Sequence, residues 1–550
     1  MNRKEEVSSE KRLFLAIALC FIVLLIYPYI MNSLFPAPPA PPAEEKKAAV
    51  ATTTENTKKS EASNAIEITK EETPVIESVS RVETPVIKAP VKIVKVETPL
   101  YKAEISTKGG GLVSFKLKKY KEEQKEGSDL INIVTPVKVR SGEKNTIDTA
   151  ISMSGFKEEL FFTPSADFIK VGTDAKKTLT LTAVTAAGLN VTKTYVFTSE
   201  DYFLDTSIKL ENNGSHPVRG TLENTITRKL DTEADVYFHK GGIVYDDDEA
   251  DRIDLDEEKS GKARVQWLGV EDKYFLLAFI PSEETYIEKW HLYSEDETSA
   301  SADVFTLFDL SPGTKEEIKL TAFVGPKEYR NLKDLDPKLG LVDSIEFGWL
   351  SGIAKPVLTG INIFYGFTGN YGIAIILLTI VIKILFYPLT KMSFVSMKKM
   401  REVMPQMQTI RERYKHDKQK MNMELMDFYK RNKVNPFAGC LPMLLQIPVF
   451  IALYEALLAA IELRHAPFMF WITDLSAKDP YFITPILMGA SMFVQQKMTP
   501  STLDPIQQKV MLFMPVVLTV VFVTFPSGLV IYWLVNNLIT IGQMWHINKD

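Results

Sequence analysis

The stretch LLTIVIKILFYPLT, residues 377–390, places a single lysine, Lys383, inside an otherwise uncharged apolar run. At about 1.5 Å per residue, the run from Tyr371 to Leu389 is long enough to cross most of a ~30 Å hydrocarbon core. A lysine near the centre of such a helix costs about 2.5–3.5 kcal/mol to insert, so it needs water, a headgroup or polar neighbours. The stretch therefore predicts a transmembrane helix that carries a functional cation.

Further apolar runs follow this one. Cys440 to Ile461 predicts another span, and Tyr481 to Gln496 predicts a short one. Val510 to Trp545 contains no charge over 36 residues, which as one helix would measure about 54 Å. Because Pro526-Ser527-Gly528 lies near its middle, we expect two antiparallel spans joined by a tight turn. The region 365–546 is thus expected to hold five transmembrane helices.

The N-terminal part has a different character. Residues 13–31 carry no charge and follow four basic residues, as a cleaved signal peptide or an uncleaved anchor would. The run is longer than a usual signal core, so we interpret 13–31 as an anchor and 1–12 as a cytoplasmic N-terminus. Residues 32–95, rich in Pro, Ala, Thr and charge, are expected to form a disordered periplasmic linker.

The middle of the chain shows a period of two. Leu204, Ile208 and Leu210, for example, alternate with polar positions, and Gly, Asn and Pro turns separate such runs. This pattern predicts a large antiparallel β-sandwich over 96–330. Residues 341–360 mix helical apolar spacing with few charges, which predicts an interfacial helix.

Orientation follows from basic residues in the short loops. Residues 1–12 carry four Lys or Arg, and a polar insert at 391–438 carries twelve against five acidic residues. We therefore expect six transmembrane helices with both termini in the cytoplasm and the β-domain in the periplasm. The insert is expected to be a cytoplasmic helical hairpin. Its eight methionines fit two readings equally well: a surface that receives hydrophobic segments, or filler of the hairpin core.

Composition excludes several classes of function. The 64 basic and 69 acidic residues give a net charge of −5, which argues against a general nucleic-acid binder. The two cysteines lie in apolar runs and the six histidines lack metal-ligand spacing. The acidic run at 246–258 lacks the glycine and spacing of a calcium loop. We expect no cofactor, no metal site and no enzyme.

Polar residues inside the expected spans indicate a water-containing cavity around Lys383. Thr379 lies one turn away on the same helix face. The other polar or amphipathic residues in the spans are Gln446, Gln495, Gln496, Thr524, Trp533, Asn536, Asn537 and Thr540. Two alternatives remain for Lys383. It could extend to the cytoplasmic headgroups, or pair with Glu455, although that pair would require a large vertical offset.

Several long motifs carry a family resemblance. KILFYPLTKMSFVSMKKMREVMPQMQ, NPFAGCLPMLLQIPVFIALYEAL, LRHAPFMFWITDLSAKDPYFITPILMGASMFVQQKM and FPSGLVIYWLVNN resemble, in order, the YidC membrane protein insertases. The match covers about 340–546. The size and position of the β-rich region are similar to the Gram-negative type, whose periplasmic domain is a β-super-sandwich akin to sugar mutarotases.

The resemblance implies a membrane protein insertase and chaperone of the bacterial inner membrane. Its partners would be nascent inner-membrane proteins, the Sec translocon, the lipid bilayer and, weakly because the chain ends MWHINKD without a basic tail, the ribosome. In the family, a groove open to cytoplasm and lipid holds a cation in the second span. The matching residue is Lys383, where we expect Arg in the Gram-negative type.

The full set of groove residues that we predict is Lys383, Thr379, Gln446, Gln496, Trp533, Asn537 and Thr540. The alternative function is a small-solute transporter or channel, in which the same polar residues would line a solute path. We see no internal repeat of the kind that transporters commonly carry. A membrane-anchored periplasmic sugar sensor is a third possibility, but it does not explain five C-terminal spans.

Overall fold

The computed structural model describes residues 90–549 apart from 126, 140–141, 154, 233–237, 263, 336–337, 433, 435–440 and 500–504. The chain divides into two units, Met1–Thr84 and Pro85–Asp550, and all described residues belong to the second. The expected cytoplasmic N-terminus, the anchor at 13–31 and most of the 32–95 linker lie outside the described residues. At the end of that expected linker, a strand already begins at Ile93.

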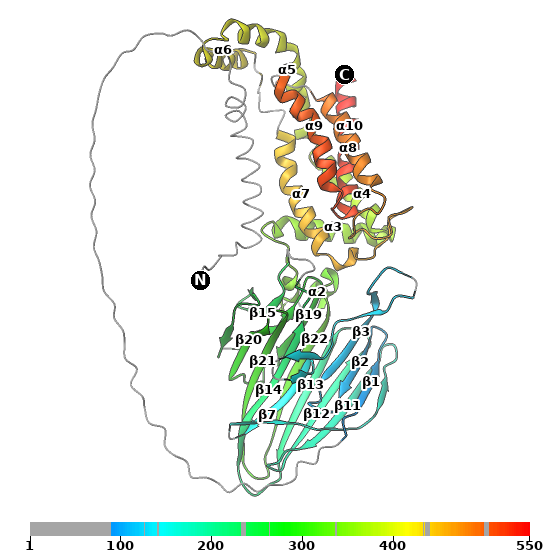
Figure 1. Ribbon diagram of the computed structural model, residues 1–550, viewed down its shortest axis with the longest axis vertical. Coiled ribbons are helices and arrows are strands. Elements are labelled where there is room, and N and C mark those ends of the chain that lie inside the picture. Colours follow the sequence, from blue (N-terminus) through cyan, green and yellow to red (C-terminus); the bar gives the residue numbers. More distant parts are fainter. Residues whose placement is uncertain are drawn as a thin grey trace, which may run out of the picture. The chain divides into compact units, whose positions relative to one another are not determined.

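Two large sheets and a small hairpin make up the β-domain in the described residues (Figure 1), and their strand pairs are antiparallel except for the parallel pair of β10 and β1. The first sheet follows the order β10 (Phe168–Lys170), β1 (Ile93–Glu97), β2 (Tyr101–Ser106), β3 (Leu112–Lys121), β7 (Ile147–Met153), β14 (Val218–Lys229), β21 (Ser299–Leu310), β20 (Lys289–Asp296) and β17 (Lys259–Gly261), with β4 (Leu130–Asn132) beside β3 and β8 (Phe156–Glu159) beside β7. The second follows β16 (Glu249–Ile253), β15 (Gly241–Asp246), β18 (Trp267–Glu271), β19 (Phe275–Pro281), β22 (Lys315–Pro326), β13 (Phe203–Asn212), β12 (Leu189–Thr198), β11 (Lys176–Val184) and β9 (Thr163–Pro164). The hairpin pairs β5 (Val137–Val139) with β6 (Gly142–Lys144).

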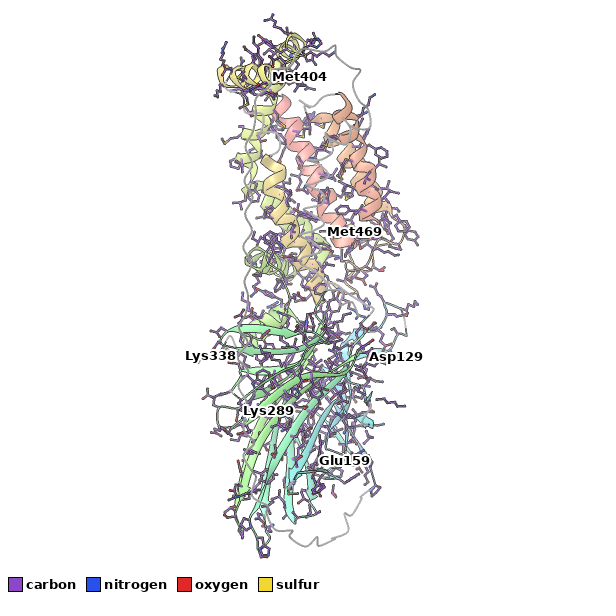
Figure 2. All side chains as sticks on the ribbon, turned by 60° about the vertical axis from the view of Figure 1, so that its left-hand side comes forward. Asp129, Glu159, Lys289, Lys338, Met404 and Met469 are labelled. Carbon is purple, nitrogen blue, oxygen red and sulfur yellow. The ribbon has the colours of Figure 1, made fainter. Side chains whose placement is uncertain are left out.

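The period of two decides which side chains enter the core of the sandwich. On β13, Leu204, Ile208 and Leu210 are buried, whereas Asp205 between them is exposed. Successive side chains of a strand point to opposite faces, so one face packs and the other meets solvent. Charged side chains such as Lys289 lie on the outside (Figure 2). The predicted β-sandwich is confirmed.

Several charged side chains of the β-domain are buried nonetheless, among them Lys193 and Glu271. Lys193, on β12, is 1% exposed and lies inside the sandwich. Its Nζ donates to Gly110 O at 3.0 Å and to Thr149 Oγ1 at 2.7 Å, and Tyr195 Oη also donates to Gly110 O, at 2.7 Å. Burial lowers the pKa of Lys193 to about 7, although the nearby Asp148 carboxyl acts in the opposite direction. These hydrogen bonds compensate part of the cost of burying the amine.

An ion-pair network holds the segment that follows the sandwich. Glu271 is 1% exposed and accepts from Lys327 Nζ at 2.8 Å and from Arg252 Nε at 2.9 Å. Burial alone raises the pKa of Glu271, but the two cations outweigh it and keep that pKa below its usual value. Both cations also donate to the carbonyl oxygen of Ser344. The chain between the sheets and the first long helix is therefore fixed to β16 and β18.

The described helices follow the sandwich in the sequence. They are α2 (Tyr329–Leu335), η1 (Leu341–Ser344), α3 (Ser351–Thr368), α4 (Tyr371–Leu385), α5 (Tyr387–Arg413), α6 (Lys418–Arg431), α7 (Leu441–Ala459), η3 (Ile461–Leu463), α8 (Ile483–Met498), α9 (Pro505–Phe522) and α10 (Ser527–Lys549). Helix α10 packs against α4 and α8, and α3 packs against α4 and α7. The helices near Lys383 thus come from segments far apart in the sequence (Figure 1).

The helix expected over 341–360 lies further along the chain. Only a short 3-10 turn, η1, occupies its first residues, and α3 runs from Ser351 to Thr368. Between them Gly348 adopts a left-handed φ of 63°, and a Cβ there would lie 2.5 Å from Glu455 Oε1. The positive φ and this close approach both require glycine in the connection between η1, which ends at Ser344, and α3. The sequence pattern could not reveal it, because Glu455 is distant along the chain.

The span expected from Tyr371 to Leu389 is also interrupted. Helix α4 ends at Leu385, and the axis bends by 62° before α5 begins at Tyr387. Pro388 has no N–H and would clash with the preceding turn inside a continuous helix, whereas it is tolerated in the first turn of a new one. The proline therefore fixes where α4 stops.

The 36-residue uncharged run is split as predicted. Helix α9 ends at Phe522 and α10 begins at Ser527. Ser527 Oγ donates to Ala477 O at 2.7 Å and to Asp474 O at 2.9 Å. The break is thus held by the loop that precedes α8, as well as by the Pro-Ser-Gly sequence.

The polar insert forms two helices, α5 and α6, with a break at residues 414–417. Its methionines differ in burial. Met400 and Met407 are buried with Leu425 in a small core between the helices, whereas Met423 and Met426 are 60% and 50% exposed. Figure 2 shows Met404 on this hairpin. Methionine is therefore both core filler and exposed surface in this hairpin.

Candidate functional site

The site is built around Lys383, near the C-terminal end of α4. Its Nζ donates to Thr540 Oγ1 at 2.9 Å, and Thr540 Oγ1 donates on to Asn536 O at 2.7 Å. Thr540 lies on α10 and is 7% exposed. Within the described part of the chain, Lys383 forms no ion pair with a carboxylate. The cation is therefore held by one hydroxyl group and is not neutralised there.

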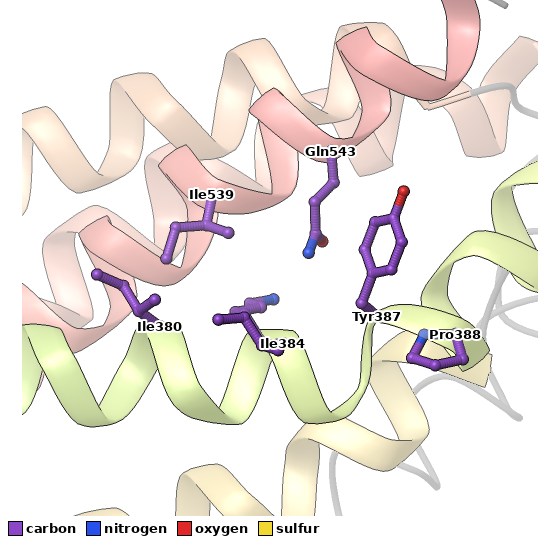
Figure 3. A pocket seen from close by; sticks show the side chains of 7 residues that line it. Ile380, Ile384, Tyr387, Pro388, Ile539 and Gln543 are labelled. Atoms are coloured by element: carbon purple, nitrogen blue, oxygen red, sulfur yellow. The ribbon is translucent and has the colours of Figure 1, made fainter.

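A cavity of about 370 Å³ opens beside this lysine. The residues that line it are Ile380, Lys383, Ile384, Tyr387, Pro388, Ile539 and Gln543. Figure 3 shows Gln543 reaching from α10 toward α4, with the Tyr387 ring beside it. Ile384 is 67% exposed and its neighbour Leu385 is 70% exposed. The cavity thus combines a cation with an apolar rim that is open to the surroundings.

The other six predicted groove residues do not line the cavity. Thr379 is buried, and its hydroxyl donates to Ile375 O within α4 at 2.7 Å. Asn537 Nδ2 donates to Ser491 Oγ at 3.0 Å and so joins α10 to α8. Of the seven predicted groove residues, the structure brings Lys383 and Thr540 into direct contact.

The other three occupy further positions in the bundle. Gln446 Nε2 on α7 donates to the Tyr532 hydroxyl of α10. Trp533 packs edge-on against Phe450, with ring centroids 4.5 Å apart. Gln496 is half-buried on α8. Gln446 and Trp533 thus connect α7 with α10. None of the three residues lines the cavity.

Lys383 is the one predicted groove residue that lines the cavity, and sequence reasoning missed the other six lining residues. Two of these six, Gln543 and Tyr387, carry polar groups. Gln543 follows Thr540 by three residues on α10, and Tyr387 follows Lys383 by four across the helix break. Helical spacing of three or four residues from an identified polar position was the available signal. The proposed Glu455 partner lies elsewhere, because its carboxylate packs beside Gly348.

The carboxylate of Asp479 connects the loop between η3 and α8 to the first turn of α8. Asp479 accepts from Thr484 N at 2.8 Å, Thr484 Oγ1 at 2.7 Å, Tyr481 N at 3.0 Å and Trp471 Nε1 at 3.0 Å. Burial raises the pKa of Asp479, but these donors outweigh burial and lower it below its usual value. The loop that holds Ser527 is therefore firmly structured.

Length and hydropathy were compared with what a membrane-crossing helix requires. Among the described residues, no single helix is both long and apolar enough to cross a bilayer, whereas the bent pair α4 and α5 qualifies when taken together.

Comparison with known proteins matches both the β-domain and the helical part of the chain to known families. Residues 363–550 match the family described as the 60Kd inner membrane protein, and residues 93–359 match the YidC periplasmic domain. The membrane protein insertase YidC of Geobacter sulfurreducens is 42% identical over 463 residues, which are 82% of this chain and 86% of that protein. That of Geotalea daltonii is 39% identical over 549 residues, covering 98% and 99%.

A solved structure of an active YidC insertase with its first transmembrane domain resolved covers 83% of this chain and 94% of its own, at 17% identity and a TM-score of 0.37. The identities of about 40% over nearly the full length and the two family matches, which together span residues 93–359 and 363–550, decide the assignment. The chain belongs to the family of YidC membrane protein insertases.

Proposed function

We propose that this inner-membrane insertase admits the polar segment of a newly made membrane protein at the cavity around Lys383. The observation that carries the proposal is the hydrogen bond from Lys383 to Thr540 beside a cavity with an apolar, exposed rim. A cation at this depth is tolerable only where water or polar groups accompany it. An acidic or polar client segment would supply further partners there.

The driving force is hydrophobic partitioning of the client. A polar segment that enters the cavity keeps part of its solvation, which lowers the barrier to crossing. The neighbouring apolar segment leaves past Ile384 and Leu385 into lipid, where burial of apolar surface is favourable. Helix α4 has 15 residues and measures about 22 Å, shorter than a ~30 Å core. Local thinning of the bilayer would accommodate this mismatch.

The remaining features of the proposal rest on the loop charges and on family resemblance. They are six transmembrane helices, cytoplasmic termini, a periplasmic β-domain, cooperation with the Sec translocon and contact with ribosomes. The predicted groove set of Lys383, Thr379, Gln446, Gln496, Trp533, Asn537 and Thr540 belongs to the same proposal. No catalytic chemistry and no cofactor enter this mechanism.

The test is reconstitution of the pure protein in liposomes. We expect a small single-span client with a short acidic tail to insert and to become protease-resistant, without leakage of a trapped solute. Empty liposomes and liposomes with a heat-denatured preparation are the controls. Solute flux without insertion would instead identify a transporter or channel.

A further inference from the structure

The loop between η3 and α8 exposes large apolar side chains. Phe470 is 85% exposed, Tyr481 is 66% exposed and Met469, which is labelled in Figure 2, is 42% exposed. Surface apolar residues that are scattered singly are ordinary, whereas a group of them in one place indicates a surface that another molecule covers. This loop therefore calls for a partner.

Two aromatic residues of the loop also hold an unfavourable backbone conformation. Phe470 has a φ of 57° and Phe482 a φ of 58°. This left-handed region is rare for a bulky side chain, and it persists only where the surrounding structure enforces it. Outliers of this kind gather at functional sites. The loop thus accepts backbone strain at the residues that present aromatic rings outward.

One buried carboxylate holds the exposed aromatic residues in place. The ring of Phe470 stacks on Trp471, with centroids 6.0 Å apart. Trp471 Nε1 donates to Asp479 Oδ1 at 3.0 Å, and Tyr481 N donates to the same oxygen at 3.0 Å. The side chain of Asp479 therefore positions both the first and the last exposed aromatic segment of the loop.

The loop lies where three helices begin. Asn370 Nδ2, at the start of α4, donates to Phe468 O at 2.8 Å. Ser527 N, at the start of α10, donates to Ala477 O at 2.8 Å. The loop itself runs directly into α8. The N-terminal ends of α4, α8 and α10 are therefore all fixed to this loop.

The exposed apolar surface continues from the loop along α8. Ile486 is 59% exposed, Leu487 is 50% exposed and Val494 is 46% exposed, and helical spacing places them on one face. In a protein of the inner membrane, such an outward apolar face contacts lipid. Helix α8 has 16 residues and measures about 24 Å, so its ends lie close to the boundaries of a ~30 Å hydrocarbon core.

We propose that residues 469–482 form an aromatic anchor in the headgroup boundary of the lipid leaflet at the N-terminal end of α8. Aromatic rings favour this boundary, where Phe470 buries apolar surface and the hydroxyl of Tyr481 meets polar headgroups. Because the loop holds three helix ends, the anchor fixes their depth, and the leaflet adapts to the short helix. The inference concerns lipid contact and does not depend on how clients pass Lys383.

Spin labels measure this contact directly. Phe470→Cys and Tyr481→Cys are labelled one at a time in the full-length protein, after the natural Cys20 and Cys440 are replaced by serine. The protein is reconstituted in liposomes of phosphatidylethanolamine and phosphatidylglycerol. Power saturation compares the accessibility of each label to oxygen, which concentrates in lipid, with its accessibility to a water-soluble nickel chelate. Phe156→Cys, on β8 of the β-domain and 73% exposed in the natural residue, is the matched control.

We expect oxygen accessibility to exceed nickel accessibility at positions 470 and 481, and the reverse at position 156. A label at Leu487→Cys reports the depth of α8. Replacement of Phe470 and Tyr481 by serine should move this label deeper, because the leaflet is no longer held at the loop, whereas Phe156→Ser should leave its depth unchanged. The first arm uses single cysteines at exposed positions, so it stands even if the double serine variant folds poorly.

Other outcomes would overturn the inference. Nickel accessibility above oxygen accessibility at positions 470 and 481 would place the loop in water. An equal oxygen preference at position 156 would show that the exposed ring of the loop has no special contact with lipid. Low accessibility to both reagents, with dipolar broadening between labels, would assign the surface to a second copy of the chain. An unchanged depth at position 487 in the double serine variant would refute the anchoring of α8. These measurements contain no client, so failure of client insertion with the lipid contact intact would refute the proposed function alone.

Discussion

Lys383 and Thr540 lie 157 residues apart in the sequence and are joined by a hydrogen bond of 2.9 Å between α4 and α10. The bond places a cation where two helices meet beside a cavity with an apolar rim. Its donor is fixed by one helix and its acceptor by another, so the position of the charge depends on the packing of both.

Substitution of Lys383 tests whether its charge attracts client segments. Lys383→Arg keeps the charge, and we expect near-normal insertion of clients with acidic tails. Lys383→Ala should slow insertion about tenfold or more, since a hydrogen bond to a charged group contributes about 1.5–3 kcal/mol. Lys383→Glu should be worse because it repels the tails. The measurement is protease protection of the client in liposomes.

Lys478→Ala is the matched control for these variants, because Lys478 is an exposed lysine in the loop before α8. If Lys383 only extends to lipid headgroups, all three Lys383 variants would insert clients normally.

Topology is open to cysteine labelling. We expect six spans with cytoplasmic termini, so Thr524→Cys, at an exposed site between α9 and α10, should react with an impermeant probe from the periplasm. Lys420→Cys on α6 should react only from the cytoplasm. The natural Cys20 and Cys440 are first replaced by serine. Labelling of position 524 from the cytoplasmic side alone would refute the proposed arrangement.

Deletion of most of the β-domain, residues 100–320, should leave insertion largely intact. The reason is that every residue lining the cavity lies at or after Ile380. Complementation of a strain depleted of its insertase is the measurement, with the membrane level of the shortened protein as the control. Loss of growth at a normal membrane level would place an essential part of the function in the periplasm.

The buried Lys193 predicts a pH dependence of β-domain stability. Its pKa is about 7 in the folded protein and about 10.4 when unfolded. Between these values the unfolded state binds more protons, so stability rises with pH, by at most about 1.4 kcal/mol per pH unit. Hydrogen-exchange protection of β12 in full-length protein, corrected for intrinsic exchange, should therefore increase from pH 7 to pH 9.

Lys193→Met should flatten this pH profile, because no amine remains to titrate. Lys209→Met, on the neighbouring strand β13 with the side chain of Lys209 37% exposed, should leave the profile unchanged. The same slope in Lys193→Met and in the unmodified protein would show that another group titrates.

Local sequence patterns were enough to predict the β-sandwich and the break in the long apolar run. Alternation at Leu204, Ile208 and Leu210 reflects the pleat of a strand, which is a local property of the backbone. Pro526-Ser527-Gly528 likewise marks a turn through local geometry. The motifs of the C-terminal half carried the family, which the comparisons confirmed.

Which polar residues meet, and which of them line the cavity, depends on the packing of distant segments. Position 348 requires glycine because the Glu455 carboxylate lies against it, and Lys383 faces Thr540 because α4 packs on α10. Gln543 enters the cavity, whereas Gln446 bonds to Tyr532. Contacts of this kind join residues far apart in the chain, and they depend on how whole helices pack. Helical spacing within one segment cannot specify them.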